Sequence, residues 1–117
     1  MQRIQQIKEY IMFKVGKLNG EYKIINLDGY RYEGYFKDSL LNGKGKIIYP
    51  VNDLILEGEF KDGKLNGYGK MIYSNGDIYE GYFQNNKLNG ICKIIYEDGD
   101  IIEGEFKDNN LINYLKI

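Results

Sequence analysis

Apolar and polar residues alternate along several short segments of the chain. In residues 67–73 and 78–83, glycine, methionine and aromatic residues hold one set of alternate positions, while charged residues, isoleucine and further tyrosines hold the other. Alternation with a period of two is typical of β-strands. Asn75-Gly76 and Asp98-Gly99 lie between such segments and predict tight hairpin turns. Because every connection is short, the sequence predicts an all-β antiparallel meander of stacked hairpins.

The alternating segments belong to a repeat of 23 or 24 residues. Two short motifs mark it, the triplet Leu-Asn-Gly and the pair Glu-Gly, and both return in the same register. A fixed period of this length indicates an array of structural repeats. The triplet begins at Leu18, Leu41, Leu65 and Leu88, and the pair begins at Glu33, Glu57, Glu80 and Glu103.

One face of the predicted sheet combines glycine with aromatic residues. Glycine inside a strand usually marks a close approach by another group, and we expect the glycines to leave room for neighbouring tyrosine and phenylalanine rings. Most of this face is predicted to form the core, although it could instead receive an apolar segment of a partner. The structural repeat positions are Gly34, Gly43, Gly45, Gly58, Gly67, Gly69, Gly81, Gly90, Gly104, Tyr32, Tyr79, Phe36, Phe60, Phe83 and Phe106.

The N-terminal residues 1–10 are predicted to cap the array. Ile4, Ile7 and Ile11 have the spacing of one helical face, which suggests a short helix over residues 2–9. Alignment by the repeat period predicts a first strand over residues 11–15. The repeat domain is therefore expected to span residues 11–117, about four and a half repeats.

The motifs Tyr-Glu-Gly-Tyr-Phe, Leu-Asn-Gly-x-Gly-Lys-x-Ile-Tyr and Asn-Gly-Asp, in this order, resemble the MORN (membrane occupation and recognition nexus) repeat. The resemblance covers residues 11–117 and implies a single elongated, twisted antiparallel sheet. It also implies a scaffolding role at cytoskeletal, ciliary or membrane-associated structures, and phospholipid binding has been attributed to the repeat. The sequence departs from the pattern at Tyr22, Leu56, Cys92 and Ile102, and at residues 51–53, where the turn is longer.

Composition limits the classes of function. The 16 basic and 17 acidic residues nearly cancel, which argues against a nucleic-acid partner. No run of about 20 apolar residues is present, and the N-terminus does not resemble a cleaved signal peptide. The single cysteine cannot form a disulfide within the chain, which fits a reducing compartment. We therefore expect a soluble, intracellular and cytoplasmic protein, with a cytoskeletal, ciliary or peripheral membrane location as the finer alternatives.

No motif predicts catalysis, a cofactor or a bound metal. The glycines and lysines of residues 41–49 lack the strand-to-helix junction and the Ser or Thr of a phosphate-binding loop. The turns around Asn75 and Asp98 are too short to wrap a calcium ion. The chain contains no histidine to bind zinc or to activate Cys92. We therefore expect a non-catalytic protein.

Besides the aromatic face, two surfaces are candidates for binding. The lysine column of Lys23, Lys46, Lys70 and Lys93 could face anionic lipid, but it shares a face with the Glu-Gly glutamates. The predicted register places Glu80 diagonal to Lys70 and Lys93, so the charges should largely cancel. Loop charges such as Lys61 beside Asp62 are expected to cancel as well.

The C-terminal segment alternates apolar residues and should form an exposed edge strand, with Leu111, Tyr114, Leu115 and Ile117 as its candidate contact residues. Other proteins or a second copy are the expected partners, through this edge or through the aromatic face. The sequence thus predicts an interaction or scaffolding module within a larger assembly. The alternative is a peripheral phospholipid-binding module.

Overall fold

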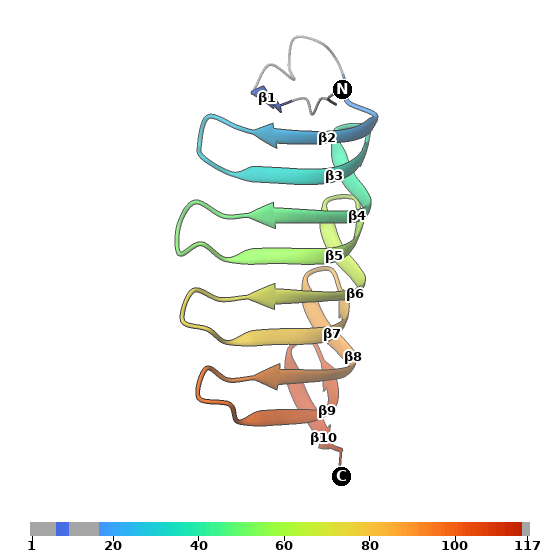
Figure 1. The fold of residues 1–117 in the computed structure, drawn as a ribbon. Helices are drawn as coiled ribbons and strands as arrows, with labels where there is room; N and C mark the ends of the chain where they lie inside the picture. Colours follow the sequence, from blue (N-terminus) through green and yellow to red (C-terminus); the bar gives the residue numbers. More distant parts are fainter. Residues whose placement is uncertain (1–6, 10–16, 116–117) are drawn as a thin grey trace, which may run out of the picture.

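A computed structural model of the protein describes residues 7–9 and 17–115 as one open β-sheet (Figure 1). The strands β2 to β10 follow one another in chain order and each pairs antiparallel with the next. The predicted all-β meander is therefore confirmed. The strands are β1 (Ile7–Glu9), β2 (Gly20–Ile25), β3 (Arg31–Lys37), β4 (Leu40–Ile48), β5 (Ile55–Lys61), β6 (Lys64–Ile72), β7 (Ile78–Gln84), β8 (Lys87–Ile95), β9 (Ile101–Lys107) and β10 (Asn110–Tyr114).

The prediction of an N-terminal helix over residues 2–9 is wrong for residues 7–9, the part of it that the structure describes. Ile7–Glu9 forms β1, which runs parallel to β2 with Ile7 opposite Lys23. The free edge of β2 offers backbone hydrogen-bonding groups to an adjacent segment, and strand pairing satisfies them where a helix would not. The rest of the predicted helix and the predicted strand over residues 11–15 lie outside the described residues. Within the described part of the chain, no helix is long and apolar enough to cross a membrane.

Two kinds of turn alternate along the sheet, and the tightest ones differ from those predicted. The two-residue turns are Asp38-Ser39, Asp62-Gly63, Asn85-Asn86 and Asp108-Asn109, each with both φ angles positive. Positive φ at both positions is the property of the tight hairpin turns that match strand twist.

Asn75-Gly76 lies instead in a longer loop. There the Tyr73 amide donates to the Asp77 carbonyl, the Gly76 amide to the Tyr73 carbonyl and the Asp77 amide to Asn75 Oδ1. The local side-chain bond of Asn75 stabilises this longer loop.

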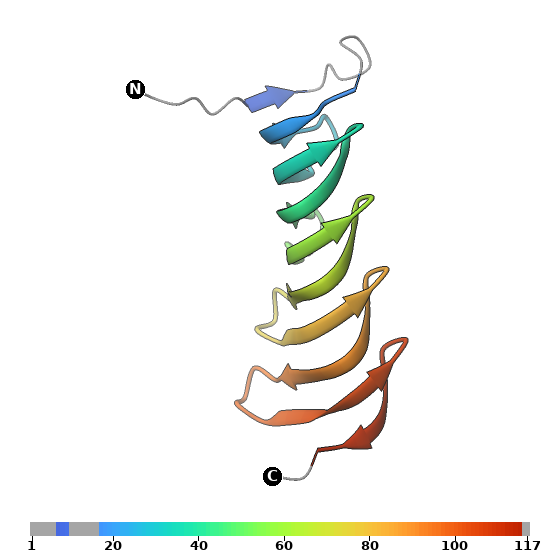
Figure 2. The same cartoon turned by 90° about the vertical axis from the view of Figure 1, so that its right-hand side faces the viewer.

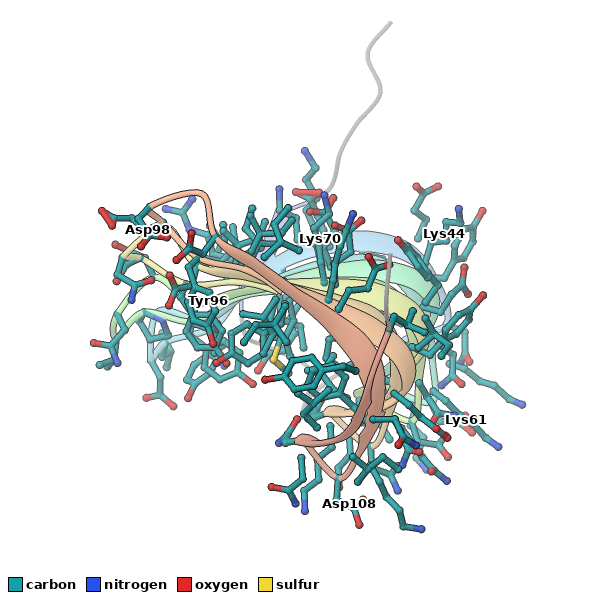
Figure 3. The ribbon with its side chains drawn as sticks, turned by 90° about the horizontal axis from the view of Figure 1, so that it is seen from below. Lys44, Lys61, Lys70, Tyr96, Asp98 and Asp108 are labelled. Carbon is teal, nitrogen blue, oxygen red and sulfur yellow. The ribbon has the colours of Figure 1, made fainter. Side chains whose placement is uncertain are left out.

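The sheet bends sharply near the Glu-Gly glycines. The strand register shifts between Gly58 and Phe60, and equivalent shifts occur in the hairpins on either side. An irregularity of this kind bends a strand, and the side and end views show the resulting curved sheet with a concave and a convex side (Figures 2 and 3).

At the bend, glycine makes room for backbone rather than for aromatic rings. A Cβ built on Gly58 would lie 2.5 Å from both Gly69 Cα and the Tyr68 carbonyl oxygen. On Gly69, the nearest side-chain atom would be Leu65 Cδ2 at 3.0 Å. The predicted ring clearance is therefore wrong for these positions, because the neighbouring strand and a leucine fill the space.

The core lies inside the bend and joins the predicted phenylalanines to the leucines of the Leu-Asn-Gly triplets, which the sequence analysis did not place in the core. Phe36, Phe60, Phe83 and Phe106 are buried, as expected for an inward aromatic face. The leucines of the Leu-Asn-Gly triplets are buried as well, and Leu65 and Leu88 have no exposed surface. Each repeat thus contributes a phenylalanine and a leucine to one continuous core.

Of the four described two-residue turns, three are clamped to the preceding repeat by paired hydrogen bonds and the fourth has half of this clamp. The Leu65 amide donates to Asn86 Oδ1 at 2.8 Å, and the Asn86 amide donates to the Leu65 carbonyl at 3.0 Å. Leu88 and Asn109 repeat this arrangement, and Ser39 Oγ accepts from the Leu18 amide in the first repeat. At Leu41 the clamp has one half, because Gly63 donates its amide but has no side chain to accept.

Completing this clamp should stabilise the protein. We expect Gly63→Asn to raise the free energy of unfolding by ~1 kcal/mol, because the new amide oxygen can accept from Leu41 and asparagine tolerates positive φ. Asn86→Gly should lower the free energy of unfolding by ~1 kcal/mol for the converse reason. Urea denaturation of both variants provides the measurement.

The control is Asn85→Gly, which introduces glycine one residue earlier in the same turn, outside the clamp. It separates the entropy of an added glycine from the loss of the hydrogen bond. Equal destabilisation by Asn85→Gly and Asn86→Gly, or no gain from Gly63→Asn, would contradict the importance of the clamp.

Candidate functional site

Tyrosines line the open part of the concave side, beyond the phenylalanine core. Near the N-terminal repeats, the Tyr30 ring lies 6.1 Å from Tyr32 and 5.2 Å from Tyr49 between centroids. These rings border a hollow of about 320 Å³ that reaches down to Phe36 and Ile47. The concave side therefore offers an apolar recess with hydroxyl groups on its walls.

The row of tyrosines continues along the later repeats. Tyr73 and Tyr79 lie 4.9 Å apart between ring centroids, and the Tyr73 hydroxyl approaches Met71 Sδ at 3.8 Å. Tyr96 lies on the same concave side, whereas Lys70 projects from the convex side (Figure 3). We call the surface formed by Tyr30, Tyr32, Tyr49, Tyr73, Tyr79 and Tyr96 the tyrosine groove.

Four phenols of the groove have a raised pKa and so remain protonated at neutral pH. Burial raises the pKa of Tyr32, Tyr49, Tyr73 and Tyr79 above the ordinary value, since it disfavours the phenolate, and neighbouring tyrosines raise it further. A protonated phenol can donate a hydrogen bond, but it is a poor general base. The groove is therefore suited to binding polar acceptors beside apolar groups.

Cys92 is not placed as a nucleophile. It is buried on the inner side, and its thiol donates to the Tyr82 carbonyl at 3.3 Å. Burial raises the pKa of the Cys92 thiol, although hydrogen bonds with the backbone partly oppose this effect. The thiolate, which is the reactive form, is therefore disfavoured. Within the described residues, no three His, Cys, Asp or Glu side chains gather to hold a metal ion.

The convex lysine column lies directly opposite glutamates. Lys70 pairs with Glu80, which also pairs with Lys93, so the predicted diagonal register is wrong by two residues. The reason is the loop geometry, because the loop closes with Tyr73 opposite Asp77. Lys23 Nζ and Glu33 Oε2 approach within 3.9 Å at an exposed site, and Lys46 lies opposite both Glu33 and Glu57. Lysine and glutamate thus alternate across the convex face and form a charge ladder.

Comparison with known families explains the repeat. A model of the MORN repeat matches residues 32–54, 57–78 and 79–101, which together make up more than half of the chain. The protein belongs to the MORN repeat family. This confirms the resemblance seen in the sequence motifs. A search of curated proteins found no match.

MORN repeats form non-catalytic modules that are generally associated with protein–protein or protein–membrane interaction. The three matched stretches include every tyrosine of the groove except Tyr30. They also include three members of the lysine column, at Lys46, Lys70 and Lys93. Both candidate surfaces are therefore products of the MORN repeat rather than additions to it.

The C-terminal edge of the MORN array is only partly as predicted. Leu111 turns its side chain toward the core, whereas Tyr114 and Leu115 are 70% and 42% exposed. Leu111 follows a two-residue turn, as do Leu65 and Leu88, so its amide and carbonyl point toward the free edge. Ile117 lies outside the described residues. Whether this edge binds a partner stays a prediction.

Sequence reasoning missed a second group of lysines, at the edge formed by the two-residue turns. We call Lys37, Lys61, Lys64, Lys87 and Lys107 the lysine edge; all five are exposed. Lys61 lies directly opposite Lys64, and Figure 3 shows Lys61 far from the Asp98 loop. Three turn aspartates share this edge, at Asp38, Asp62 and Asp108. The signal for the edge was the recurrence of lysine beside every turn of this type.

Proposed function

We propose that this MORN protein is a non-catalytic interaction module that binds a protein partner in the tyrosine groove. The observation that supports this function most directly is the recess of about 320 Å³ between Tyr30, Tyr32 and Tyr49. Clefts that combine apolar walls with a few fixed polar groups are the usual form of binding sites. In the described residues no second layer covers this side of the sheet.

The groove also indicates the chemistry of the partner. Its walls supply aromatic surface and protonated phenols, so the partner should present an apolar segment with hydrogen-bond acceptors beside it. Because the same tyrosine position recurs along the array, an elongated segment would meet several rings. A module of this kind acts as a scaffold or small subunit of a larger assembly, at a cytoskeletal, ciliary or membrane-associated structure as the family suggests.

The groove is tested by removing two of its rings. We expect the double substitution Tyr30→Ala and Tyr49→Ala to reduce partner capture more than about tenfold, because truncating aromatic hot spots typically costs ~2 kcal/mol or more. The measurement is an affinity pull-down from the native source with quantitative mass spectrometry, followed by titration of the captured protein. Tyr35→Ala is the matched control, since Tyr35 is 53% exposed on the convex face. Equal loss in the control, or no loss in the double variant, would sink the groove proposal.

Strand addition at β10 supplies a second contact in this proposal. An exposed edge strand can pair with a strand of another protein or of a second copy. Leu111 already presents its outward amide and carbonyl in the way that Leu65 and Leu88 present theirs to the next turn. A partner strand or turn could therefore extend the array.

The edge can be tested by truncation. Deleting residues 111–117 removes the outward amide and carbonyl of Leu111 together with the rest of the edge strand, and the remaining repeats should stay folded as judged by circular dichroism. We expect the truncated protein to lose dimerisation or capture of its partner, because the hydrogen-bonding edge is removed. Sedimentation velocity of both proteins over a concentration range, together with the pull-down, gives the readout. Unchanged association after the deletion would count against this edge.

Peripheral phospholipid binding is the second candidate function, and the lysine edge favours it. Lys61 and Lys64 place like charges directly opposite each other, which is unfavourable unless an anion or another counter-charge relieves it. The convex lysines suit this role less well, because each lies opposite a glutamate. Any lipid contact should therefore involve the lysine edge more than the predicted column.

Co-sedimentation with phosphatidylserine vesicles tests this alternative. If lipid binds at the lysine edge, Lys61→Gln with Lys64→Gln should weaken binding by ~2 kcal/mol, and added salt should weaken it further. The same double change at Lys70 and Lys93 is the control and should have a smaller effect. No binding to anionic vesicles at low salt, or a larger effect in the control, would rule out lipid recognition by this edge.

A further inference from the structure

The convex face carries a continuous row of isoleucines beside the loops. One isoleucine from each of the six consecutive strands β4 to β9 lies directly opposite the isoleucine of the next strand. The row lies on the opposite side of the sheet from the phenylalanine core. We call these residues the isoleucine stripe: Ile48, Ile55, Ile72, Ile78, Ile95 and Ile101.

The stripe is an apolar surface where a polar one is expected. When one face of an antiparallel sheet packs on the core, its other face is usually polar. Here Ile101 remains 56% exposed, and the other members are partly covered by their neighbours in the same row. Contiguous exposed apolar patches mark interaction sites more often than isolated apolar residues do.

Acidic loops border one side of the stripe. The loops over residues 26–30, 49–54, 73–77 and 96–100 contain six carboxylates and neither lysine nor arginine. Asp98, in one of them, lies at the loop end of the sheet, with Lys70 further along the convex face (Figure 3). We call this border the acidic edge: Asp28, Asp53, Asp77, Glu97, Asp98 and Asp100.

The other border of the stripe is the charge ladder, in which lysine and glutamate alternate from strand to strand. It has almost no net charge, so the electrostatic field beside the stripe is set by the acidic edge. A ligand that fits both borders needs an apolar strip, positive charge along one flank and mixed polar residues along the other. Charge complementarity of this kind selects partners and fixes their orientation.

We propose that the isoleucine stripe binds an amphipathic helix of a partner protein, with a basic flank against the acidic edge. Six strands spaced ~4.8 Å apart span about 24 Å, the length of a helix of about 16 residues. Apolar residues that recur on average every 3.5 residues along a helix are ~5.2 Å apart. Such a helix lying across the strands places one apolar side chain near each isoleucine. This surface is distinct from the tyrosine groove, which lies on the opposite face.

Other occupants fit the surface less well. An extended strand presents side chains on one face every ~6.7 Å, so it loses register with the isoleucines within a few strands. A second copy of the chain matches the spacing, but its own convex face supplies a neutral ladder and a further acidic edge. Anionic lipid is repelled by the acidic edge. The basic helix alone satisfies both the spacing and the charge.

The proposal is tested by measuring how tightly synthetic peptides bind to the protein. One peptide of about 16 residues carries leucine at the seam positions of a helix and lysine along one flank. A second replaces those lysines with glutamate, and a third has the composition of the first in an order that destroys the apolar seam. Fluorescence anisotropy should show binding of the first peptide at least about tenfold tighter than that of either other peptide, with the advantage over glutamate declining as salt rises.

Matched variants locate the site. Ile72→Thr with Ile95→Thr keeps β-branched residues in the strands but removes apolar surface, and should weaken the lysine peptide about tenfold or more. Ile91→Thr makes the same change on β8, on the same convex face but outside the stripe, where Ile91 is 48% exposed. It should leave binding within about twofold of wild type, which corresponds to less than ~0.5 kcal/mol. Circular dichroism confirms that all variants are folded.

The results separate this proposal from the groove. Nuclear magnetic resonance shifts at the stripe, with normal binding by the Tyr30 and Tyr49 groove variant, would support it. Equal affinity for the lysine and glutamate peptides, or shifts confined to the tyrosine groove, would overturn it. The proposal would also be overturned if the lysine peptide did not bind and the stripe instead mediated dimerisation or binding to neutral vesicles. Each of these outcomes leaves the groove proposal to its own test.

Discussion

The close packing of glycine and leucine at the bend of each hairpin is the constraint on which the rest of the structure depends. Strands approach there so closely that a Cβ on Gly81 would lie 2.6 Å from Cys92 Cα. A leucine side chain fills the inside of the bend. In one repeat, for example, Leu41 Cδ2 would lie 3.0 Å from a Cβ built on Gly45. A side chain larger than hydrogen would separate the strands, whereas a residue smaller than leucine would leave a cavity. Glycine and leucine therefore act together as one structural unit in each repeat.

The bend allows a single sheet to have both a core and a binding surface. An unbent single sheet would bury little apolar area, but the bend brings both arms of each hairpin around the phenylalanines and leucines. The tyrosines lie further out on the same concave side, where they are only half-buried. The same repeat thus supplies stability through phenylalanine and leucine and recognition through tyrosine. The hydrogen bonds between each two-residue turn and the leucine of the preceding repeat hold successive repeats in this arrangement.

The sequence predicted the properties that local pattern determines and missed those that depend on neighbouring repeats. Alternation correctly assigned residues such as Tyr79 and Glu80 to opposite faces, and the period gave the strand order. It did not reveal the burial of Leu65, because a leucine beside lysine and asparagine resembles part of a loop until the bend is known. The two-residue register error at Glu80 arose because hydrogen bonds within the loop set the position at which it closes, with Tyr73 opposite Asp77. Tyr30 and Tyr49 were not recognised as neighbours, since two different loops bring their rings together.

Charge segregation is the property that the linear sequence conceals most completely. Lys61 is next to Asp62, and lysines alternate with glutamates across the sheet, so summing charges along the chain suggests cancellation. The meander nevertheless stacks every longer loop at one edge and every two-residue turn at the other (Figure 1). Like charges in successive repeats then lie ~10 Å apart, about one screening length at physiological salt, and reinforce one another. A chain with a net charge of −1 can therefore present an acidic edge and a lysine edge, and it can discriminate between partners by charge.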